Sequence, residues 1–485
     1  MQQLKIKVDD FYYVVETLFL SYIIFDKTIC LKNFVNRTKE QARIRKILTG
    51  KKYGFIVVYG RRRCGKSTLL KRILSDTDIY FMADQTESTQ QITLLAQTIA
   101  RQVAGFDLVK YPNLEALFVT LNQRITGRIS LCLDEFPYMV KSSPGLPSVI
   151  QKLIDRGDNR FHLIVCGSSQ QLMNGLIIDS TAPLYGRADL ILKVKPMKLA
   201  YLQEVLQCIA SEAVTEFSVW GGVPRYWELR QQETSLTAAL KTHLFSSFGT
   251  LIEEPLRLFV DDMLDTAQSY TILSLIGNGV HRMSEIAARL EKPATSLAGP
   301  LDRLIQLGYI DRELPFGENE RNSKKSYYRI SDPFLNFYFT YIIPNRSLIE
   351  LDKGDAVLQR LTESFTGYTS FWWEKLCRQA VSGTLIEGRT FGYAKSWWGN
   401  VSKNERIEID VIAGSTDGKA LLVGECKWTE NENAARLIYE LEEKANKLPF
   451  AKGKTIIPCL FLKTKPVDNI LQKLFFPDDI VQMLK

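Results

Sequence analysis

The sequence has little histidine and no closely spaced cysteines. Its 485 residues include only three histidines, His162, His243 and His281, which lie far apart. The two nearest of its eight cysteines, Cys426 and Cys459, are still 33 residues apart. We therefore do not expect a histidine-rich metal centre, a paired-histidine nuclease site or a zinc ribbon built on a CxxC pair.

Long apolar runs are lacking as well, and we expect no secretory leader. The most apolar stretch, residues 11–25, has 15 residues and includes Glu16, whereas a transmembrane helix needs about 20 apolar residues. Asp9 and Asp10 precede it, in place of the basic residues of a signal peptide. We expect an extra strand or helix there, or a start assigned too far upstream, and treat residues 1–33 as an extension of unclear role. The protein is thus expected to be cytoplasmic, with reduced thiols and no membrane partner.

The composition is that of an ordinary globular protein. Apolar residues make up 45% and charged residues 24%, which argues against a disordered or fibrous chain. The length favours two to four domains of about 150 residues each. The net charge of +8 is a mild basic excess, which permits a polyanionic partner such as nucleic acid without requiring one.

Apolar runs rich in β-formers alternate with helical patterns in the first 200 residues. Because continuous apolar strands separated by helices are typical of a parallel sheet covered on both faces, we predict an α/β fold. The runs are 55–59 (FIVVY), 79–82 (IYFM), 129–133 (ISLCL), 161–166 (FHLIVC) and 189–194 (DLILKV).

A phosphate-loop motif follows the first of these strands. Residues 60–68, GRRRCGKST, match the pattern GxxxxGK[ST] between a strand and a helical run, which disfavours a chance match. The glycines let the backbone curl so that its N–H groups cradle phosphates. Lys66 is expected to reach the β- and γ-phosphates of ATP, and the Ser67 hydroxyl to bind Mg²⁺. The expected ATP-binding residues here are Gly60, Arg61, Arg62, Arg63, Cys64, Gly65, Lys66, Ser67 and Thr68.

The strand that ends in Asp134 supplies the second half of the expected site. A carboxylate at the carboxyl end of a buried parallel strand faces the crevice where nucleotides bind, so we expect Asp134 to help hold Mg²⁺. The next residue, Glu135, is placed to deprotonate the attacking water, with Lys66 as the other catalytic residue. The alternative is that these two acidic residues only cap a turn. Together the two motifs predict ATP hydrolysis.

Further polar residues follow the later strands. Ser168 or Ser169 is expected to contact the γ-phosphate or the water, or else to cap a helix. Arg187 and Arg225 are candidates for stabilising transferred charge, although surface ion pairs are the commoner role of such arginines. Residues 43–75 hold 11 Lys and Arg but no Asp or Glu, and we interpret this excess as attraction of ATP rather than a nucleic-acid groove.

Residues 268–332 predict three short helices followed by a basic hairpin. The apolar spacing fits a winged helix-turn-helix. The region has nine basic and eight acidic residues, so its charge gives no strong signature of DNA binding. Pro344 and Asn345 are expected to open a linker.

Carboxylates gather on two predicted strands near the C-terminus. A Gly/Asp turn separates residues 406–412 from 420–427, which indicates a hairpin. Since strand side chains alternate, Glu408 and Asp410 share one face of the first strand, and Glu425 and Lys427 share one face of the second. Both strands are otherwise apolar, so these charges are not an ordinary solvated face. With Glu374 on an upstream aromatic helix, Asp410 and Glu425 could bind Mg²⁺ and Lys427 could stabilise charge during attack on a phosphodiester.

The ordered motifs GRRRCGKST, LCLDEF, LIVCGSS, LYGRADLIL and GGVPRYW resemble the archaeal-type ATPases of the STAND branch of AAA-like P-loop NTPases, over residues 34–345. By this resemblance Gly221, Gly222 and Pro224 belong to a helical lid, with Pro224 near the adenine. It also implies a signalling switch, which often oligomerises with ATP. The winged helix would then act as a regulatory lid on the ATPase or contact DNA.

Glu374, Asp410, Glu425 and Lys427 resemble the metal and catalytic residues of PD-(D/E)XK restriction-endonuclease-like domains, over residues 365–465. Ile409 stands where the family name has proline. This resemblance implies that Asp410 and Glu425 hold Mg²⁺. A nuclease-like domain that is inactive, or only binds nucleic acid, is the alternative.

We therefore expect an Mg²⁺-dependent, ATP-hydrolysing switch joined to a domain that binds or cuts nucleic acid, with DNA favoured. The alternatives are an ATP-gated regulator and a protein-remodelling ATPase, each with an inactive nuclease-like domain. The expected domains are a P-loop ATPase core (34–200), a helical lid (201–267), a winged helix (268–345) and a restriction-endonuclease-like α/β domain (346–485).

Overall fold

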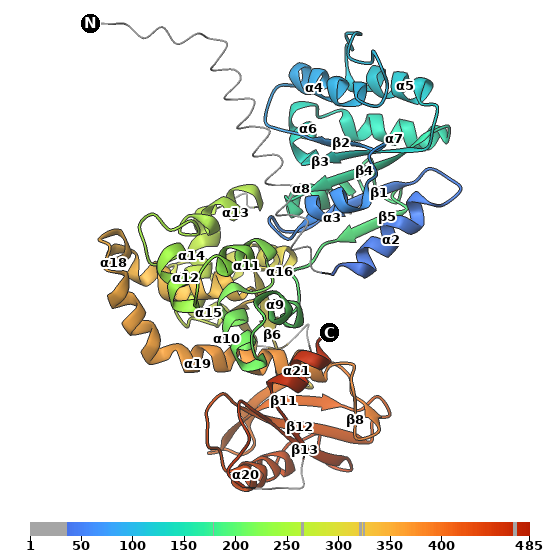
Figure 1. The fold of residues 1–485 in the computed structure, drawn as a ribbon. Coiled ribbons are helices and arrows are strands. Elements are labelled where there is room, and N and C mark those ends of the chain that lie inside the picture. Colours follow the sequence, from blue (N-terminus) through green and yellow to red (C-terminus); the bar gives the residue numbers. More distant parts are fainter. Residues whose placement is uncertain (1–35, 178, 263–265, 320–322, 324, 469–472) are drawn as a thin grey trace, which may run out of the picture. The chain divides into compact units, whose positions relative to one another are not determined.

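The computed structural model (Figure 1) describes residues 36–485 except 178, 263–265, 320–322, 324 and 469–472, so the element expected at residues 11–25 lies outside the described residues. The described chain forms two compact units that interleave along the sequence. The first unit contains the described residues up to Tyr59, Gly65–Gly167 and Leu176–Val194. The second contains Gly60–Cys64, Ser168–Gly175 and Lys195–Lys485.

The first unit is built on the predicted parallel sheet. Its five strands run in the order β2-β3-β4-β1-β5 and every pair is parallel. Strands β1 and β4 are buried along their whole length, as expected for strands covered on both faces. The carboxyl ends of β1, β3 and β4 therefore meet at one edge of the sheet. The strands are β1 (Phe55–Tyr59), β2 (Ile79–Met82), β3 (Ile129–Asp134), β4 (Phe161–Gly167) and β5 (Leu190–Lys193).

Local sequence signals explain where the helices of this unit begin and end. Asn113 caps α5, because its side chain accepts the backbone N–H of Ala116 at 2.8 Å. Helix α7 has proline in its first turn and ends at Gly157, whose φ of 70° is the left-handed conformation that favours glycine. The helices are α2 (Thr38–Leu48), α3 (Lys66–Ile73), α4 (Ser88–Ala100), α5 (Leu114–Arg124), α6 (Phe136–Ser142) and α7 (Leu146–Arg156). Helix α8 (Gln170–Ile177) runs across the division between the units.

The second unit continues with helices at the expected lid. Position 222 in this region requires glycine because two chain segments approach closely there. A Cβ on Gly222 would lie 2.2 Å from the Met197 carbonyl oxygen. The Met197 N–H in turn donates to the Gly222 carbonyl at 2.7 Å, so no larger residue fits between these segments. The helices are α9 (Leu199–Leu206), α10 (Ala210–Trp220), α11 (Pro224–Gln231), α12 (Leu236–His243) and α13 (Glu254–Asp262).

Three helical segments and an antiparallel hairpin come next, in the predicted order. They are α14 (Thr266–Gly277), α15 (Met283–Arg289), α16 (Ala298–Leu307) with a preceding 3₁₀ turn at Ala294–Leu297, and the strands β6 (Ile310–Glu313) and β7 (Tyr327–Ile330).

The linker expected at Pro344 and Asn345 is wrong. The chain stays helical through α17 (Pro333–Phe337), the turns Tyr338–Ile342 and Ile343–Asn345, and α18 (Arg346–Glu350). Asn345 is buried, and it donates to the Tyr341 carbonyl and accepts from Arg360 at 2.7 Å. Pro344 breaks the regular helix only locally, because surrounding aromatic side chains pack this segment into the core. Helix α19 (Gly354–Val381) follows.

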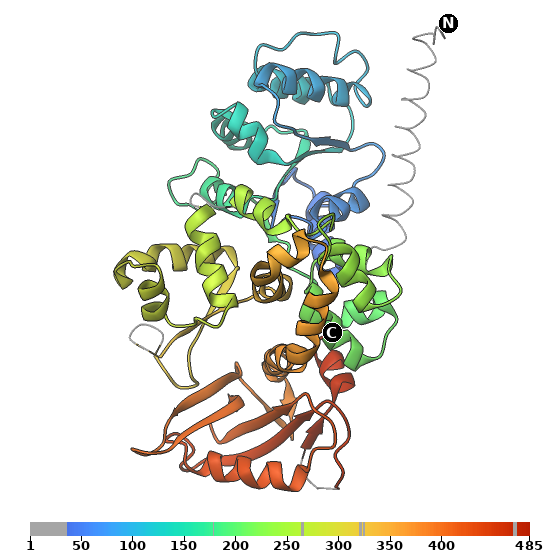
Figure 2. The same ribbon diagram turned by 90° about the vertical axis from the view of Figure 1, so that its left-hand side faces the viewer.

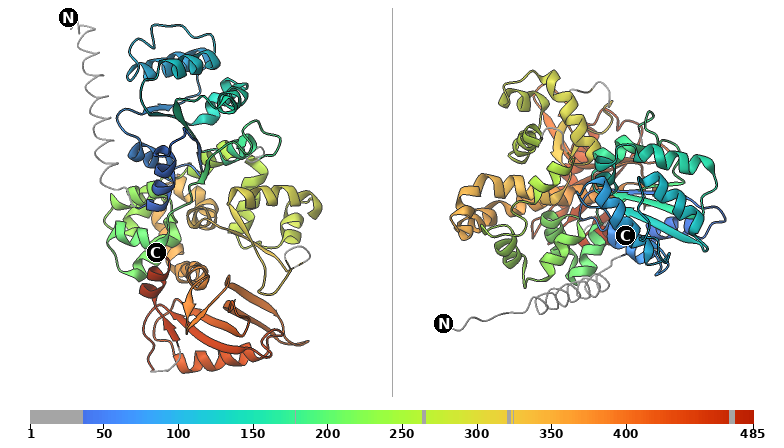
Figure 3. Two further views of the ribbon diagram at one scale, coloured as in Figure 1. Left: turned by 90° about the vertical axis from the view of Figure 1, so that its right-hand side faces the viewer. Right: turned by 90° about the horizontal axis from the view of Figure 1, so that it is seen from above.

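The C-terminal part of the second unit is a mixed sheet with helices on both faces. Its strands run in the order β10-β11-β12-β13-β14, antiparallel from β10 to β12 and parallel from β12 to β14. The predicted hairpin of β11 and β12 is confirmed. Helix α20 lies along one face, whereas the end of α19 and α21 pack on the other (Figures 2 and 3). The elements are β10 (Lys395–Asn400), β11 (Arg406–Gly414), β12 (Ala420–Lys427), β13 (Thr455–Leu462), β14 (Lys473–Phe475), α20 (Ala434–Asn446) and α21 (Pro477–Met483), with a small pair β8 (Leu385–Ile386) and β9 (Arg389–Thr390) before them.

Across the described residues, every helix is too short or too polar to cross a bilayer.

Candidate nucleotide and carboxylate sites

The backbone of residues 60–68 has the shape that phosphate binding needs. Gly60 and Gly65 have φ values of 149° and 82°, and Arg63 is also left-handed at 65°. Helix α3 begins at Lys66, directly after Gly65. A curled loop that leads into a helix N-terminus directs backbone N–H groups toward one point and favours an anion there.

In the first unit, the residues expected to hold Mg²⁺ lie together. Ser67 is hydrogen-bonded to Asp134, which is fully buried at the end of β3. The Tyr80 hydroxyl, on the neighbouring strand β2, donates to Asp134 at 2.5 Å. Burial raises the pKa of Asp134, but hydrogen bonds from Cys166, Ser67 and Tyr80 outweigh it and hold the pKa below its usual value. The carboxylate is therefore charged, as a group that helps hold a divalent cation must be.

Glu135 is in a strained backbone conformation. Its φ of 51° is left-handed, which is uncommon for a residue with a side chain and costs about 1–3 kcal/mol where it occurs. Such strain clusters at active sites, and here it turns the chain sharply between β3 and α6. Asp134 also accepts the Glu135 N–H at 2.9 Å. The turn-capping bond expected under the alternative reading is therefore present together with the Ser67–Asp134 hydrogen bond expected of a metal site.

In the second unit, two arginines of the loop are paired with distant carboxylates. Arg61 lies 2.5 Å from Asp332, and both side chains are buried. Arg63 lies 2.9 Å from Glu254, which also accepts the Tyr226 hydroxyl at 3.1 Å. Burial raises the pKa of Glu254, and Arg63 opposes that effect. The local count of basic residues thus overstates the positive charge available to ATP, because carboxylates remote in sequence balance Arg61 and Arg63.

The other residues expected near the nucleotide have mixed outcomes. Ser168 is buried, and Ser169 accepts the Leu172 N–H at 3.4 Å, a weak bond of the helix-capping kind. Pro224 occupies the first turn of α11. Both candidate charge stabilisers form ion pairs instead: Arg187 with Asp155 at 2.9 Å, and Arg225 with Glu228 at 2.8 Å.

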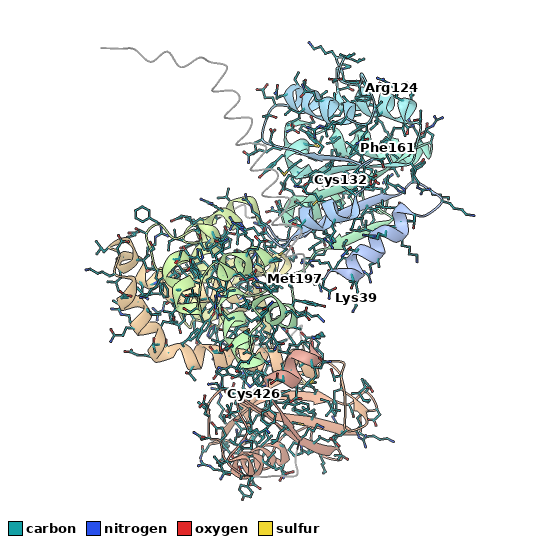
Figure 4. The ribbon with its side chains drawn as sticks, in the orientation of Figure 1. Lys39, Arg124, Cys132, Phe161, Met197 and Cys426 are labelled. Atoms are coloured by element: carbon teal, nitrogen blue, oxygen red, sulfur yellow. The ribbon has the colours of Figure 1, made fainter. Side chains whose placement is uncertain are left out.

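The C-terminal carboxylates are brought together by α19, β11 and β12. Asp410 directly precedes Val411, which pairs with Gly424 on the neighbouring strand, and Glu425 directly follows Gly424. Asp410 accepts the Cys426 N–H at 2.8 Å, and Cys426 is labelled in Figure 4. From α19, Arg378 donates to the Asp410 carbonyl at 3.0 Å and lies 3.6 Å from Glu374.

Glu425 is held by two lysines. The Lys427 and Lys444 ammonium groups lie 2.8 and 3.1 Å from its two oxygens. Lys444, from helix α20, was missed by the sequence analysis because its helix was not connected with these strands.

Burial and repulsion between neighbouring carboxylates raise the pKa values of two carboxyl groups in this region. Burial and the Glu425 charge raise the pKa of Asp410 to about 6. Burial and the Asp410 charge raise the pKa of Glu374 to about 8, although 31% of its side chain remains accessible. Carboxyl groups that resist ionisation together are typical of sites that bind a cation or exchange protons.

The fit to a metal ion is partial. Asp410 and Glu425 present oxygen ligands of the type that Mg²⁺ prefers. However, in the part of the chain that the structure describes, no group of three or more His, Cys, Asp or Glu side chains has the arrangement of a metal site. A further ligand from water or substrate would be needed, which is usual for Mg²⁺.

Two family models match the sequence. Residues 34–226 match an ATPase domain found predominantly in Archaea. Residues 338–438 match a domain of archaeal and bacterial proteins of unknown function, and this range includes Glu374, Asp410, Glu425 and Lys427. An uncharacterized protein of Methanocaldococcus jannaschii is 29% identical over 409 residues, which cover 82% of this chain and 88% of that protein.

Solved structures give only distant likenesses. The Aeropyrum pernix ORC2 protein is 18% identical with a TM-score of 0.39, over 68% of this chain and 97% of that one. A STAND protein with a tetratricopeptide sensor from Pyrococcus horikoshii is 15% identical with a TM-score of 0.32, over 71% of this chain and 49% of that one. TM-scores this low support no argument about fold or function.

The matching ATPase model, the shape of the phosphate loop and the Ser67–Asp134 hydrogen bond together show that residues 34–226 contain an archaeal-type P-loop ATPase domain.

Proposed function

We propose that the protein is an Mg²⁺-dependent ATP-hydrolysing switch whose C-terminal domain binds and cuts nucleic acid, with DNA favoured. Lys66 binds the β- and γ-phosphates, Ser67 and Asp134 hold Mg²⁺, and Glu135 takes a proton from the attacking water. The observation that carries the ATPase role is the buried, ionised Asp134 hydrogen-bonded to Ser67 beside the strained Glu135.

The test of the ATPase role is turnover by Lys66→Ala and Glu135→Gln. We expect the first variant to lose nucleotide binding and the second to keep it but hydrolyse ATP slowly. ATPase activity that survives both substitutions would contradict this assignment.

For the C-terminal domain, the supporting observation is the convergence of Glu374, Asp410 and Glu425 beside Lys427. The sequence of a long helix, antiparallel strands, a helix and a parallel strand also resembles restriction-endonuclease-like domains. Asp410 and Glu425 would hold Mg²⁺, which would polarise the phosphodiester. A water oxygen would bond to phosphorus as the bond to the leaving oxygen breaks, and a proton from that water would reach the leaving oxygen. Lys427 would stabilise the charge that develops.

The nuclease role is tested by incubating wild type and Asp410→Ala with plasmid DNA and, separately, with circular single-stranded DNA, each with Mg²⁺. We expect only the wild type to cut. Equal cleavage by both proteins would remove Asp410 from the mechanism.

A second candidate is an ATP-gated regulator whose nuclease-like domain does not cut. The two lysines that neutralise Glu425 favour it, because they compete with a metal ion for the same oxygens. If Mg²⁺ binding is undetectable by calorimetry and plasmid DNA stays intact, this candidate is preferred. A remodelling ATPase that acts on proteins is preferred instead if nucleic acid neither binds nor changes the ATPase rate.

We also propose that residues 268–345 are a winged helix and that ATP promotes self-association. The observed order of three helical segments and a hairpin supports the winged helix. Light scattering with and without ATP tests the self-association, and an unchanged molar mass would contradict it.

A further inference from the structure

The second unit contains a large pocket beside the carboxylate site. Its volume is about 960 Å³, and it is lined by helix α16, strand β6, helix α19 and the start of strand β10. The hairpin formed by β6 and β7 reaches strand β10. Phe316 donates a backbone hydrogen bond to the Ser396 carbonyl at 2.9 Å, and Tyr327 stacks on Trp398. The walls of the pocket are thus fixed to one another by backbone and aromatic contacts.

One arginine connects the pocket with the carboxylates. Arg378 lines the pocket, and its guanidinium also donates to the Asp410 carbonyl and lies 3.6 Å from Glu374. A phosphate bound in the pocket by Arg378 would therefore lie next to Glu374 and Asp410. Because a guanidinium forms its strongest hydrogen bonds with anionic acceptors, this position favours an anionic ligand such as a phosphodiester.

The pocket also offers an aromatic surface. Tyr393 lines it and is 76% exposed, so its ring is accessible to a ligand. Lys375 lies over the Trp372 ring and pairs with Asp311 at 2.6 Å, so it stands between the two walls. An exposed ring next to basic side chains is the combination by which proteins bind unpaired nucleic-acid bases and their backbone.

The size and charge of the pocket favour a single strand of nucleic acid over a duplex. Four basic and three acidic residues line it, which makes it far less basic than a groove for a duplex. Its volume falls within the range of about 300–1,000 Å³ that is typical of sites for single small molecules, so it admits a few nucleotides and not a double helix. The lining residues with charge are Arg312, Lys375, Arg378, Lys395, Asp302, Asp311 and Glu313.

We propose that this pocket binds a short stretch of single-stranded nucleic acid, stacks one base on Tyr393 and presents the adjoining phosphodiester to Glu374 and Asp410. The proposal rests on the proposed nuclease function and names its substrate as an unpaired strand. Lys395 and Lys375 contact the backbone, and the acidic residues of the lining keep the affinity modest.

The test is fluorescence anisotropy of the full-length protein with a labelled 12-nucleotide single-stranded DNA, the same RNA sequence and the matching DNA duplex, without Mg²⁺. We expect the single strands to bind more tightly than the duplex. Tyr393→Ala should weaken single-strand binding about tenfold, because stacking on an aromatic ring contributes about 1–3 kcal/mol per base and 1.4 kcal/mol is a factor of ten. Tyr393→Phe should bind like wild type, because stacking does not need the hydroxyl.

Matched controls separate the pocket from the rest of the surface. Tyr439, on α20, is 66% exposed and lies outside the pocket, so Tyr439→Ala should leave binding unchanged. With about three phosphates neutralised at 0.7 each, the slope of log affinity against log salt should be near −2. Tighter binding of the duplex, or equal affinities for Tyr393→Ala and wild type, would overturn the proposal.

Binding and cutting are scored separately. If Tyr393→Ala weakens binding while Asp410→Ala cuts circular single-stranded DNA with Mg²⁺ as well as wild type does, the nuclease assignment fails and the pocket stands. If wild type cuts and Asp410→Ala does not, but Tyr393→Ala binds normally, the pocket proposal fails and the nuclease assignment stands.

Discussion

The buried pair of Arg61 and Asp332 makes a strong prediction about stability. Asp332 has two roles: Oδ2 pairs with Arg61, and Oδ1 accepts the Leu335 N–H at 2.8 Å as the cap of α17. The change Asp332→Asn removes the charge and keeps a side chain that caps helices equally well. It therefore isolates the ion pair from the cap.

The expected cost follows from burial. Both side chains are less than 10% accessible, so Arg61 cannot reach water when its partner loses the charge. Breaking one partner of a buried pair costs about 3–5 kcal/mol, and we expect Asp332→Asn to fall in that range. Asp332→Ala should lose a further ~0.5–2 kcal/mol, because it removes the cap as well.

Tryptophan fluorescence during urea unfolding is the assay. All seven tryptophans lie between residues 220 and 428, inside the second unit, so the signal reports on the unit that holds this pair. The exposed pair of Arg225 and Glu228 is the matched control, and Glu228→Gln should change stability by less than ~1 kcal/mol. The double variant Arg61→Met, Asp332→Asn should recover most of the loss, because no unpaired buried charge remains. A cost for Asp332→Asn no larger than that of Glu228→Gln would refute the reasoning.

Three further predictions concern single side chains. Glu374→Gln should raise the melting temperature at pH 8.5 and leave it unchanged at pH 4. The pKa of Glu374 is raised from 4.5 to about 8 in the folded protein, so the fold disfavours the ionised carboxylate. Wild type therefore loses stability as the pH rises from about 4.5 to about 8, whereas the glutamine variant does not. Gly222→Ala should destabilise by about 1–3 kcal/mol in urea unfolding, since its Cβ would lie 2.2 Å from the Met197 oxygen, and an unchanged midpoint would contradict that contact. Tyr80→Phe removes a hydrogen bond that lowers the pKa of Asp134, so the acid limb of the ATPase pH profile should move to higher pH, whereas an unmoved limb would exclude this role.

The features that the sequence predicts well are those with short-range causes. The phosphate loop and its helix follow from nine consecutive residues, and the parallel sheet follows from continuous apolar runs. The Gly/Asp turn between two apolar runs predicted the hairpin of β11 and β12, which the register confirms.

The features that it missed depend on tertiary structure. Tyr80 reaches Asp134 only because β2 and β3 are neighbours in the sheet, and Lys444 reaches Glu425 only because α20 packs on β12. The linker expected at Asn345 failed because burial among aromatic rings outweighed the local effect of proline. The pocket beside Arg378 has walls that are far apart in the sequence, so no pattern within either segment could indicate it.

The pairing of Arg61 and Arg63 with carboxylates far along the chain has an evolutionary consequence. Arg61 pairs with Asp332 and Arg63 with Glu254, and both carboxylates are buried. A descendant that lost Arg61 alone would retain a buried carboxylate without its cation, at a cost of about 3–5 kcal/mol. Selection therefore acts on residues 61 and 332 jointly, although they are far apart in the chain. In an alignment of relatives these two positions should change together, while the second half of the loop varies independently of residue 332.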